Sequence, residues 1–410
     1  MTVSPAGQPI PADFAGPPGP AQLTEWESLD RMARPARLAR LRARFAEAGV
    51  DAYFGVRPEH MRYLTGFRLG AGEDKVAGQS GQFLVGGEEI VVLADSRYTI
   101  QVRREAAEAK LFEVYHDLPA RWAELVGSVG ARRVAVEASF VAHATWTGLV
   151  EAARDVELVP VEGWVEADRA TKEPAELERV AAACAIADRA LAAILPRIRP
   201  GATELELALA LEWEMRTNGA EALAFDVACL SGPQAALPHG SPRDEPIGEG
   251  AVLLFDFGAQ VAGYRSDMTR TLFVGEPQER DLAVYELVAR SQRAAVQLLE
   301  ARLAEGAGLP IGREVDAAAR AVIEEDGRWP AYGHGLGHGI GLATHEGPSL
   351  GRSPASDATL PPRTVFSVEP GIYLEGEMGV RIEDLVTVDA AAGRLEWLTR
   401  FPRSVIVVGR

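Results

Sequence analysis

The stretch GHGLGHGIGLATHEGP (residues 333–348) contains the clearest candidates for chemistry in this sequence. It holds three of the chain's seven histidines, His334, His338 and His345, and six of its sixteen residues are glycine. So many glycines argue against a helix and leave the backbone open to close approach, and we expect those beside His338 to leave room for a substrate strand. Imidazoles displayed on such a backbone are typical of sites that bind a metal ion or move a proton.

Two aspartates form a second pattern. Asp256 interrupts the apolar run AVLLFDFG, where an uncompensated carboxylate is costly to bury. Asp267 follows eleven residues later, and the midpoint between the two falls at VAGY, next to Gly263. A hairpin turn there would set the two acids opposite one another on neighbouring antiparallel strands. Because like charges in that position repel, the arrangement predicts a cation between them.

Two glutamates repeat the pattern. Glu369 in FSVEPGIY and Glu383 in VRIEDLV have their midpoint at Gly376. Four carboxylates and one imidazole would form a ligand shell for two divalent ions, which lie about 3.5–4 Å apart in sites of this kind. Carboxylates with a single nitrogen suit Mn²⁺, Co²⁺ or Zn²⁺, and the absence of thiolate ligands argues against a structural zinc site.

The alternative for each acid is a structural ion pair. Asp256 could pair with Arg265 or Arg270, and Glu383 could pair with Arg381. Any one acid taken alone fits that interpretation equally well. Four acids in two hairpins, combined with the histidine-rich stretch, favour the metal site.

These residues need a framework, and the hydrophobic pattern predicts two domains. An arginine-rich helix at 28–49 is followed by short β-rich runs that alternate with helices, such as YTIQVRREAAEAK, which predicts an α/β domain over residues 28–165. The arginines do not share one face, so a solvated helix or a subunit contact is a better interpretation than a nucleic-acid patch. Pro174 marks the first turn of a helix in the second domain, residues 166–410. The helices expected there span 174–196, 203–218, 279–305 and 312–326.

Composition narrows the class of protein. The chain has 410 residues, 47% of them hydrophobic, and a formal net charge of −17, which argues against nucleic acid or an anionic membrane as the main partner. Residues 1–27, rich in proline and glycine, are expected to form a flexible arm without the features of a secretory signal. No apolar stretch reaches the length of a transmembrane helix, so we expect a cytoplasmic protein. Cys184 and Cys229 lie in apolar surroundings and are predicted to be buried free thiols, with one long-range disulfide as the alternative.

Taken together, several stretches resemble the creatinase/prolidase/methionine aminopeptidase family of "pita-bread" metallopeptidases: SGPQAALPHG, LLFDFGAQVAGYRSDMTRT, GHGLGHGIGLATHEGP, FSVEPGIY and GVRIED. They extend over residues 231–384. The resemblance implies the α/β class, with an N-terminal creatinase-like α/β domain before a pita-bread catalytic domain, whose curved antiparallel sheet is flanked by helices. Short methionine aminopeptidases lack such an upstream domain, so the Xaa-Pro peptidases and creatinases are the better match.

The resemblance also implies roles for individual residues. The family's five metal ligands fall on Asp256, Asp267, His338, Glu369 and Glu383. The first would chelate one ion, the histidine and Glu369 would hold the other, and Asp267 and Glu383 would bridge both.

The other candidate catalytic residues surround these ligands. His345 and His239 (in LPHG) match substrate-contacting histidines, and one or the other would donate a hydrogen bond to the developing oxyanion. Glu369 would also shuttle a proton from the attacking water to the leaving nitrogen. His334 would lie on the cleft wall as a further catalytic candidate or, alternatively, as a supporting hydrogen-bonding group.

The implied reaction is hydrolysis of the bond before proline in short peptides, by an Xaa-Pro dipeptidase (prolidase) or by aminopeptidase P. A dipeptidase must recognise a free carboxylate, preferably with an arginine. Some prolidases have one four residues after the equivalent of His345, where this chain has Ser349, but Arg352 is nearby and is the substrate-binding candidate. The loop GFRLGAGEDKVAGQSG offers Arg68 and Lys75, and a loop that closed the far end of the site would favour the dipeptidase.

Two other classes are alternatives. One is a binding or chaperone-like protein that has lost catalysis, and the other is a metal-free hydrolase like creatinase. Both would be expected to have lost metal ligands, whereas this chain retains all five. The resemblance further implies a homodimer.

Overall fold

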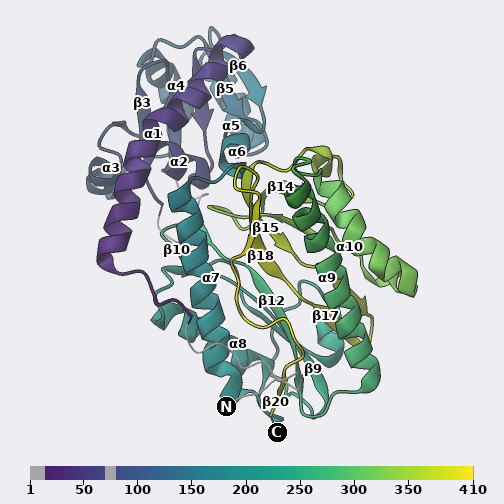
Figure 1. The fold of residues 1–410 in the computed structure, drawn as a ribbon. Coiled ribbons are helices and arrows are strands. Elements are labelled where there is room, and N and C mark those ends of the chain that lie inside the picture. Colours follow the sequence, from purple (N-terminus) through teal and green to yellow (C-terminus); the bar gives the residue numbers. More distant parts are fainter. Residues whose placement is uncertain (1–13, 70–79, 410) are drawn as a thin grey trace. The chain divides into compact units, whose positions relative to one another are not determined.

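The computed structural model describes residues 14–69 and 80–409, which form two compact units (Figure 1). Of the described residues, 24–69 and 80–168 form the N-terminal unit, and 14–23 together with 169–409 form the C-terminal unit. The division falls just after the domain boundary that the sequence predicts at residue 165. Lys75 and the first part of the predicted arm lie outside the described residues.

The N-terminal unit is built on a mixed six-stranded sheet in the order β4-β3-β2-β1-β5-β6. Strands β1, β5 and β6 run parallel, and β2 lies antiparallel to both β1 and β3. Trp122 is fully buried in its core and meets Phe54 edge-on, with ring centroids 5.1 Å apart. The elements are α1 (Pro20–Ala48), β1 (Ala52–Gly55), α2 (Pro58–Thr65), β2 (Gln82–Val85), β3 (Ile90–Ala94), α3 (Thr99–Glu105), β4 (Lys110–Glu113), α4 (Leu118–Gly127), β5 (Arg133–Glu137), α5 (His143–Ala152), β6 (Glu157–Val161) and α6 (Trp164–Ala170). Two helices cross the limits of this unit: the first residues of α1 and the last two of α6, Arg169 and Ala170, belong to the C-terminal unit.

Helix α1 differs from its prediction in two respects. It begins at Pro20, eight residues before the predicted start at 28, because proline is well tolerated in the first turn of a helix. Some of its arginines are structural: Arg37 is 1% exposed and donates to Asp30 (3.0 Å) and to the carbonyl of Tyr63 (3.0 Å). These contacts leave Arg37 unavailable to a charged partner.

The C-terminal unit consists of mainly antiparallel sheets covered by four long helices. Helices α7 and α8 pack on the strands around β8 and β10, and α9 and α10 pack on the strands around β15 and β14 (Figure 1). The elements are α7 (Pro174–Ile194), α8 (Glu204–Thr217), β7 (Ala222–Leu223), β8 (Ala228–Ser231), β9 (Ala251–Phe257), β10 (Ala259–Val261), β11 (Tyr264–Arg265), β12 (Met268–Val274), α9 (Glu279–Glu305), α10 (Gly312–Asp326), β13 (Gly337–Gly339), β14 (Glu346–Leu350), β15 (Arg363–Val368), β16 (Gly371–Leu374), β17 (Met378–Arg381), β18 (Asp384–Asp389), β19 (Arg394–Trp397) and β20 (Val407–Val408).

Two of these sheets carry the candidate ligands and are joined at their centre. One has the order β20-β12-β9-β8 and the other β14-β13-β15-β18-β19. They meet where the amide of Glu383 donates to the carbonyl of Thr269 (3.1 Å) and the hydroxyl of Thr271, in β12, donates to the carbonyl of Arg381 in β17 (2.9 Å). The strands β8 and β14 therefore lie at opposite edges of the joined sheets, with the ligand-bearing strands between them.

A buried arginine locks this junction. The side chain of Arg270 is 1% exposed and donates to Asp384 Oδ1 (2.6 Å) and to the carbonyl oxygens of Glu383 (2.6 Å) and Phe401 (2.7 Å). Gln292 in α9 donates to the other oxygen of Asp384 (2.9 Å). One charged pair thus fixes β12, the start of β18 and the C-terminal segment together.

Two smaller predictions can be compared with the fold. Cys184 and Cys229 are both free and buried, as predicted, and burial raises the pKa of both thiols well above the usual value. Among the described residues, no helix combines the length and the apolar character that crossing a bilayer requires.

The Arg270 junction gives a first testable prediction. Removing Arg270 takes the buried partner from Asp384 and leaves it with the half-exposed Arg403 (3.2 Å), so Arg270→Met should lower the free energy of unfolding by about 3–5 kcal/mol. Urea unfolding followed by circular dichroism measures the loss. Arg394→Met, which removes the exposed pair with Glu396, is the control and should change the midpoint little. Equal effects of the two substitutions would show that the junction carries no special stability.

Candidate metal centre

The first aspartate pair comes from the β9–β12 hairpin, with a register that differs from the prediction. Its turn lies at Ala262 and Gly263, both with positive φ (46° and 85°), as expected for VAGY. Asp256 is opposite Thr269, however, and the same register sets Asp267 opposite Gly258. The aspartates are therefore diagonal neighbours on one face of the hairpin, where long side chains still meet.

The second hairpin has the predicted register. In both its ladders the paired residue numbers are symmetric about Gly376, which has a φ of 75°. Glu369 follows β15 and Glu383 precedes β18, so the register sets the two glutamates opposite each other. Both lie in the interruption between two ladders, where their side chains can turn away from regular pairing.

His338 reaches the acids from β13, and its glycine neighbours have a different role from the predicted one. A Cβ at Gly337 would lie 2.0 Å from the carbonyl oxygen of Ser367, and one at Gly339 would lie 2.0 Å from that of Gly347. The space beside these glycines is therefore filled by neighbouring backbone, and the expectation that it receives a substrate strand is wrong. Glycine lets β13 lie tightly between β14 and β15.

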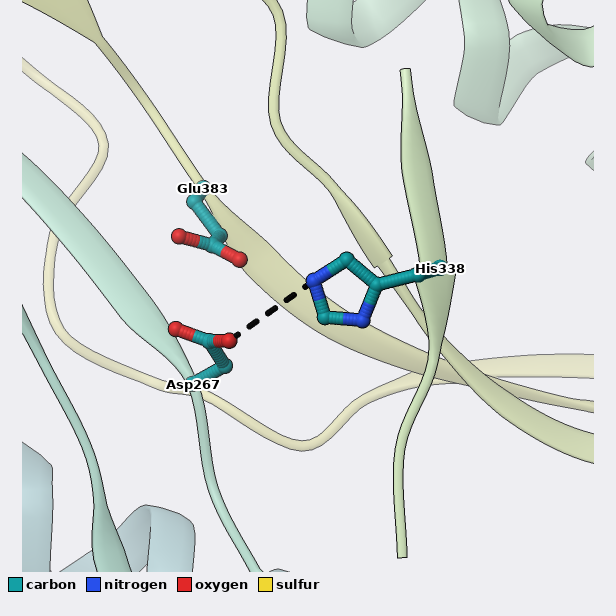
Figure 2. Close-up of side chains that lie close together, drawn as sticks. All are labelled: Asp267, His338 and Glu383. Carbon is teal, nitrogen blue, oxygen red and sulfur yellow. Dashed lines mark ion pairs between the residues drawn. The ribbon is translucent and has the colours of Figure 1, made fainter. Parts of the chain in front are cut away.

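The side chains of Asp267, His338 and Glu383 converge from three separate segments (Figure 2). Each offers one ligand atom, and these atoms all lie within 4.8 Å of one another. Nε2 of His338 is 3.8 Å from Asp267 Oδ2 and 3.3 Å from Glu369 Oε1. Because Nδ1 of His338 faces the carbonyl of Gly339 (3.1 Å), it carries the hydrogen, and the lone pair of Nε2 points at the acids. Burial lowers the pKa of His338, which keeps that lone pair free.

The structural ion pairs considered as an alternative to a metal site, Asp256 with Arg265 or Arg270 and Glu383 with Arg381, do not form. Arg270 pairs with Asp384, and Arg265 donates to Thr344 (2.8 Å). Arg381 pairs with Asp256 Oδ2 (2.5 Å) rather than with Glu383. One arginine therefore offsets one of the four negative charges.

The other three carboxyl groups, Asp267, Glu369 and Glu383, repel one another when they are ionised. Burial and the nearby carboxylates, Glu383 first, raise the pKa of Asp267 well above its usual value. Burial and the charges of Glu369 and Asp256 do the same to the pKa of Glu383, and burial also raises that of Glu369. Bound cations would favour the ionised form of these carboxyl groups and so reverse the rise in their pKa. The crowding of the four acids is therefore consistent with a site that binds metal ions.

The donor set fits divalent metal ions. Oδ1 of Asp256 is buried and has no hydrogen-bond partner, although Oδ2 of the same carboxylate is paired. An orphaned carboxylate oxygen, a histidine lone pair and three further acids provide oxygen and nitrogen donors without a thiolate. These residues would hold the metal.

Three further residues support the ligands. The sequence-based prediction did not single out Tyr373 and Ser367, and it considered Arg381 only as a partner of Glu383. Arg381 donates to the Tyr373 hydroxyl (2.8 Å), which in turn contacts Nε2 of His334 (3.0 Å). The hydroxyl of Ser367 donates to Glu369 Oε1 (3.0 Å). Their separations in the sequence, from two residues (Ser367 and Glu369) to 39 (His334 and Tyr373), follow no motif spacing, so only the alternation of strand faces could have indicated them.

The ligands lie in a pocket of about 1110 Å³ that also contains the other candidates. His334, His239, His345 and Arg352 all line it. The rings of His345 and His338 have centroids 4.1 Å apart, and desolvation together with the neighbouring imidazoles lowers the pKa of His345. Arg68, in contrast, pairs with Glu105 (2.9 Å) within the N-terminal unit.

Comparison with known proteins agrees with this geometry. Residues 178–390 match metallopeptidase family M24, and residues 37–171 match the creatinase/prolidase N-terminal domain. The chain belongs to the M24 family. The predicted fold class, a creatinase-like domain followed by a pita-bread domain, is confirmed. Membership of a family of metallopeptidases also implies that the chain uses metal.

Several relatives of this M24 protein have named activities. The Xaa-Pro dipeptidase of Pyrococcus furiosus is 32% identical over 353 residues, 86% of this chain and 94% of that protein. The structure of an Xaa-Pro dipeptidase from Bacillus anthracis is 33% identical with a TM-score of 0.81, covering 92% of this chain and 100% of its own. An X-Pro aminopeptidase from Thermotoga maritima is 33% identical with a TM-score of 0.79, covering 90% and 99%.

The charge crowding gives a second prediction. In chelator-treated protein at pH 7, Asp267→Asn should unfold at a higher temperature than the parent, because it removes one repelling charge; each kcal/mol corresponds to about 2–4 °C. A raised pKa means that the metal-free folded state loses stability as pH rises above the ordinary carboxyl range, so the advantage should shrink towards pH 5. With excess Mn²⁺ the order should invert, because the variant has lost a ligand.

Differential scanning calorimetry with and without chelator measures these differences. Glu396→Gln, an exposed acid on β19, is the control and should shift none of them. Identical midpoints for parent and Asp267→Asn in the metal-free state would contradict the proposed repulsion.

Proposed function

We propose that this chain is a dinuclear metal-dependent Xaa-Pro peptidase that prefers dipeptides. The observation that carries the proposal is the convergence of four carboxylates and His338 on one pocket, with Asp267 and Glu383 close enough to share a cation with the imidazole. The named activities of its relatives, Xaa-Pro dipeptidase and X-Pro aminopeptidase, support the substrate class. The homodimer implied by the resemblance and the cytoplasmic location expected from the sequence stay predictions.

Two divalent ions would be held by the five residues that the resemblance identifies: Asp256, Asp267, His338, Glu369 and Glu383. Bound there, Mn²⁺, Co²⁺ or Zn²⁺ would supply Lewis acidity towards the scissile carbonyl and would lower the pKa of a water molecule. The chain's own contribution is to hold these ligands rigidly. Thr269, for example, donates its hydroxyl to Glu383 Oε2 (2.7 Å) and accepts from Arg381 (2.8 Å).

Glu369 is the proposed proton carrier. Its Oε1 accepts from Ser367 (3.0 Å), which leaves Oε2 to take a proton from water and pass it to the proline nitrogen. Burial raises the pKa of this carboxyl, which suits the role, because it moves the group towards the range in which a general acid–base residue can both accept and release a proton. The proline nitrogen leaves as a secondary amine and must be protonated to do so.

His345 and His239 are the proposed donors to the carbonyl oxygen. Both line the pocket, and the ring of His345 lies against that of His338. A neutral imidazole still carries one N–H group, which can stabilise negative charge as it develops on that oxygen. His334, held by Tyr373, is the proposed support for the opposite wall.

Arg352 is the proposed anchor for the substrate carboxylate. It lies just beyond the end of β14, which is an edge strand, and it is exposed to the pocket that holds the ligands. An arginine matches a carboxylate with two parallel hydrogen bonds, and only a dipeptide presents that group one residue after the scissile bond.

Aminopeptidase P activity is the second candidate. A pocket of about 1110 Å³ exceeds what a dipeptide fills, so peptides that continue past proline have space. The X-Pro aminopeptidase among the structural relatives supports the same alternative.

Substrate length separates the two activities. With Mn²⁺-loaded protein, Ala-Pro should be hydrolysed with the highest kcat/KM, ahead of Ala-Pro-Ala and longer peptides, as measured by proline or amine release. Chelation, or Asp267→Ala, should abolish turnover. Comparable rates for all lengths would reject the dipeptidase and leave aminopeptidase P, and no hydrolysis by metal-loaded protein would reject both.

The role of Arg352 gives a separate prediction. Arg352→Gln should reduce kcat/KM for Ala-Pro about 10- to 100-fold, the range of a charge-assisted hydrogen bond, through a higher KM. Ala-Pro-amide, which lacks the carboxylate, should lose little. Arg394→Gln, on β19 at the other edge of the sheet, is the matched control for charge and should leave both substrates unaffected. A parallel loss for both substrates would show that Arg352 does not read the carboxylate.

A further inference from the structure

We propose that Glu346, Arg169 and Lys172 form a buried ionic triad that positions His345, which makes Glu346 a positioning residue for hydrolysis. The inference rests on the function proposed above, since it acts through His345. It concerns residues outside the metal ligands. Glu346 belongs to the histidine-rich stretch 333–348, but no chemical role is predicted for it from the sequence.

The triad is closed and almost completely buried. Lys172 Nζ donates to Glu346 Oε1 (2.8 Å), and Arg169 pairs with Oε2 of the same carboxylate. The side chains of Glu346, Arg169 and Lys172 are 4%, 2% and 1% exposed. Although burial alone would raise it, the two cations hold the pKa of Glu346 at about 2. Because both oxygens of Glu346 are paired, its side chain cannot rotate, and this restrains the backbone at residue 346 as well.

His345 depends on its neighbours for its orientation. No hydrogen bond holds its ring within the described part of the chain, although it is surrounded by anchored residues. On one side, Thr344 accepts from Arg265 (2.8 Å) and donates to the carbonyl of Ala224 (3.2 Å). On the other side, Glu346 Oε2 accepts from the amide of Ala343 (3.2 Å), which closes the turn that contains the histidine. The position of the imidazole is therefore set by the residues before and after it.

Gly341 shows that the sequence makes room for this triad. A Cβ there would lie 2.6 Å from Glu346 Oε1 and 3.1 Å from Lys172 Cε. Glu346 cannot move aside, because Lys172 holds that oxygen. The glycine in GIGLATHEG thus permits the close approach of the pair.

The triad also connects His345 to the opposite strand of the site. The amide of Lys172 donates to the carbonyl of Arg363 (2.8 Å), the first residue of β15. That strand leads directly to Glu369, the proposed proton carrier. One charged cluster therefore sets the spacing between the strand that ends at Glu369 and the turn that presents His345.

A double-mutant cycle tests the inference. Glu346→Gln keeps the shape but removes the charge, so kcat on Ala-Pro should fall about tenfold with KM within about threefold and with bound metal unchanged. In the His345→Ala background the same substitution should cost less than about twofold, because there is no imidazole left to position. Lys172→Met, which leaves the arginine pair, should show the same pattern with a smaller loss, and covers the case in which Glu346→Gln fails to fold.

Glu137→Gln is the matched control. Glu137 is a buried carboxylate of the N-terminal unit, paired with Tyr53 (2.6 Å) and His60 (2.6 Å), so its loss tests general destabilisation. Any effect it has should be equal in both backgrounds.

Two results would overturn the inference: equal losses from the Glu346 or Lys172 variants with and without His345, or a loss of bound metal that accounts for the fall in kcat. A parent protein that binds metal and hydrolyses no Xaa-Pro peptide would instead reject the proposed function itself.

Discussion

Asp256, Asp267, Glu369 and Glu383 bring four negative charges into one largely buried space, and Arg381 offsets only one of them. Ionised groups so placed repel at short range in a medium of low dielectric. The folded chain must therefore hold them against their own repulsion until cations arrive. That requirement explains why so much of the surrounding structure is rigid, charged and buried.

The framework meets this requirement with buried polar contacts. Thr269 and Arg270 join the strand after Asp267 to the segment around Glu383, and Asp384 draws in α9 through Gln292. Apolar residues of the same volume would stabilise the fold as well, since buried ion pairs seldom exceed a hydrophobic contact in stability. Hydrogen-bonded ion pairs, unlike apolar contacts, are directional, so each one fixes the position of one strand along the next. The geometry of the metal ligands requires that precision, and packing alone does not provide it.

Features set by short stretches of sequence, such as helix ends and hairpin turns, could be predicted from the sequence. The helices at 279–305 and 312–326 have the predicted bounds because each ends at a glycine in the left-handed conformation, Gly306 and Gly327. The hairpin around Gly376 kept its predicted register. The first hairpin did not, because its register is symmetric about the bond between Ala262 and Gly263, one residue from the midpoint of the aspartates. The short helices α2, α4, α5 and α6 lacked a pattern long enough to be recognised.

Long-range partners escaped prediction for a different reason. Arg381 could be assigned to Glu383 by proximity in sequence, yet it pairs with Asp256, 125 residues away. The spacing of residues along the sequence does not indicate which strand an arginine side chain will face. The role of Gly337 and Gly339 could not be predicted from spacing either. Both positions require glycine because the backbone of a neighbouring strand lies too close to leave room for a Cβ, and not because a ligand approaches there. Their histidine is therefore held between two strands, and its lone pair is aimed before any metal binds. A ligand that needs no rearrangement binds metal without a conformational cost, so the glycines contribute to metal affinity although they touch no ion.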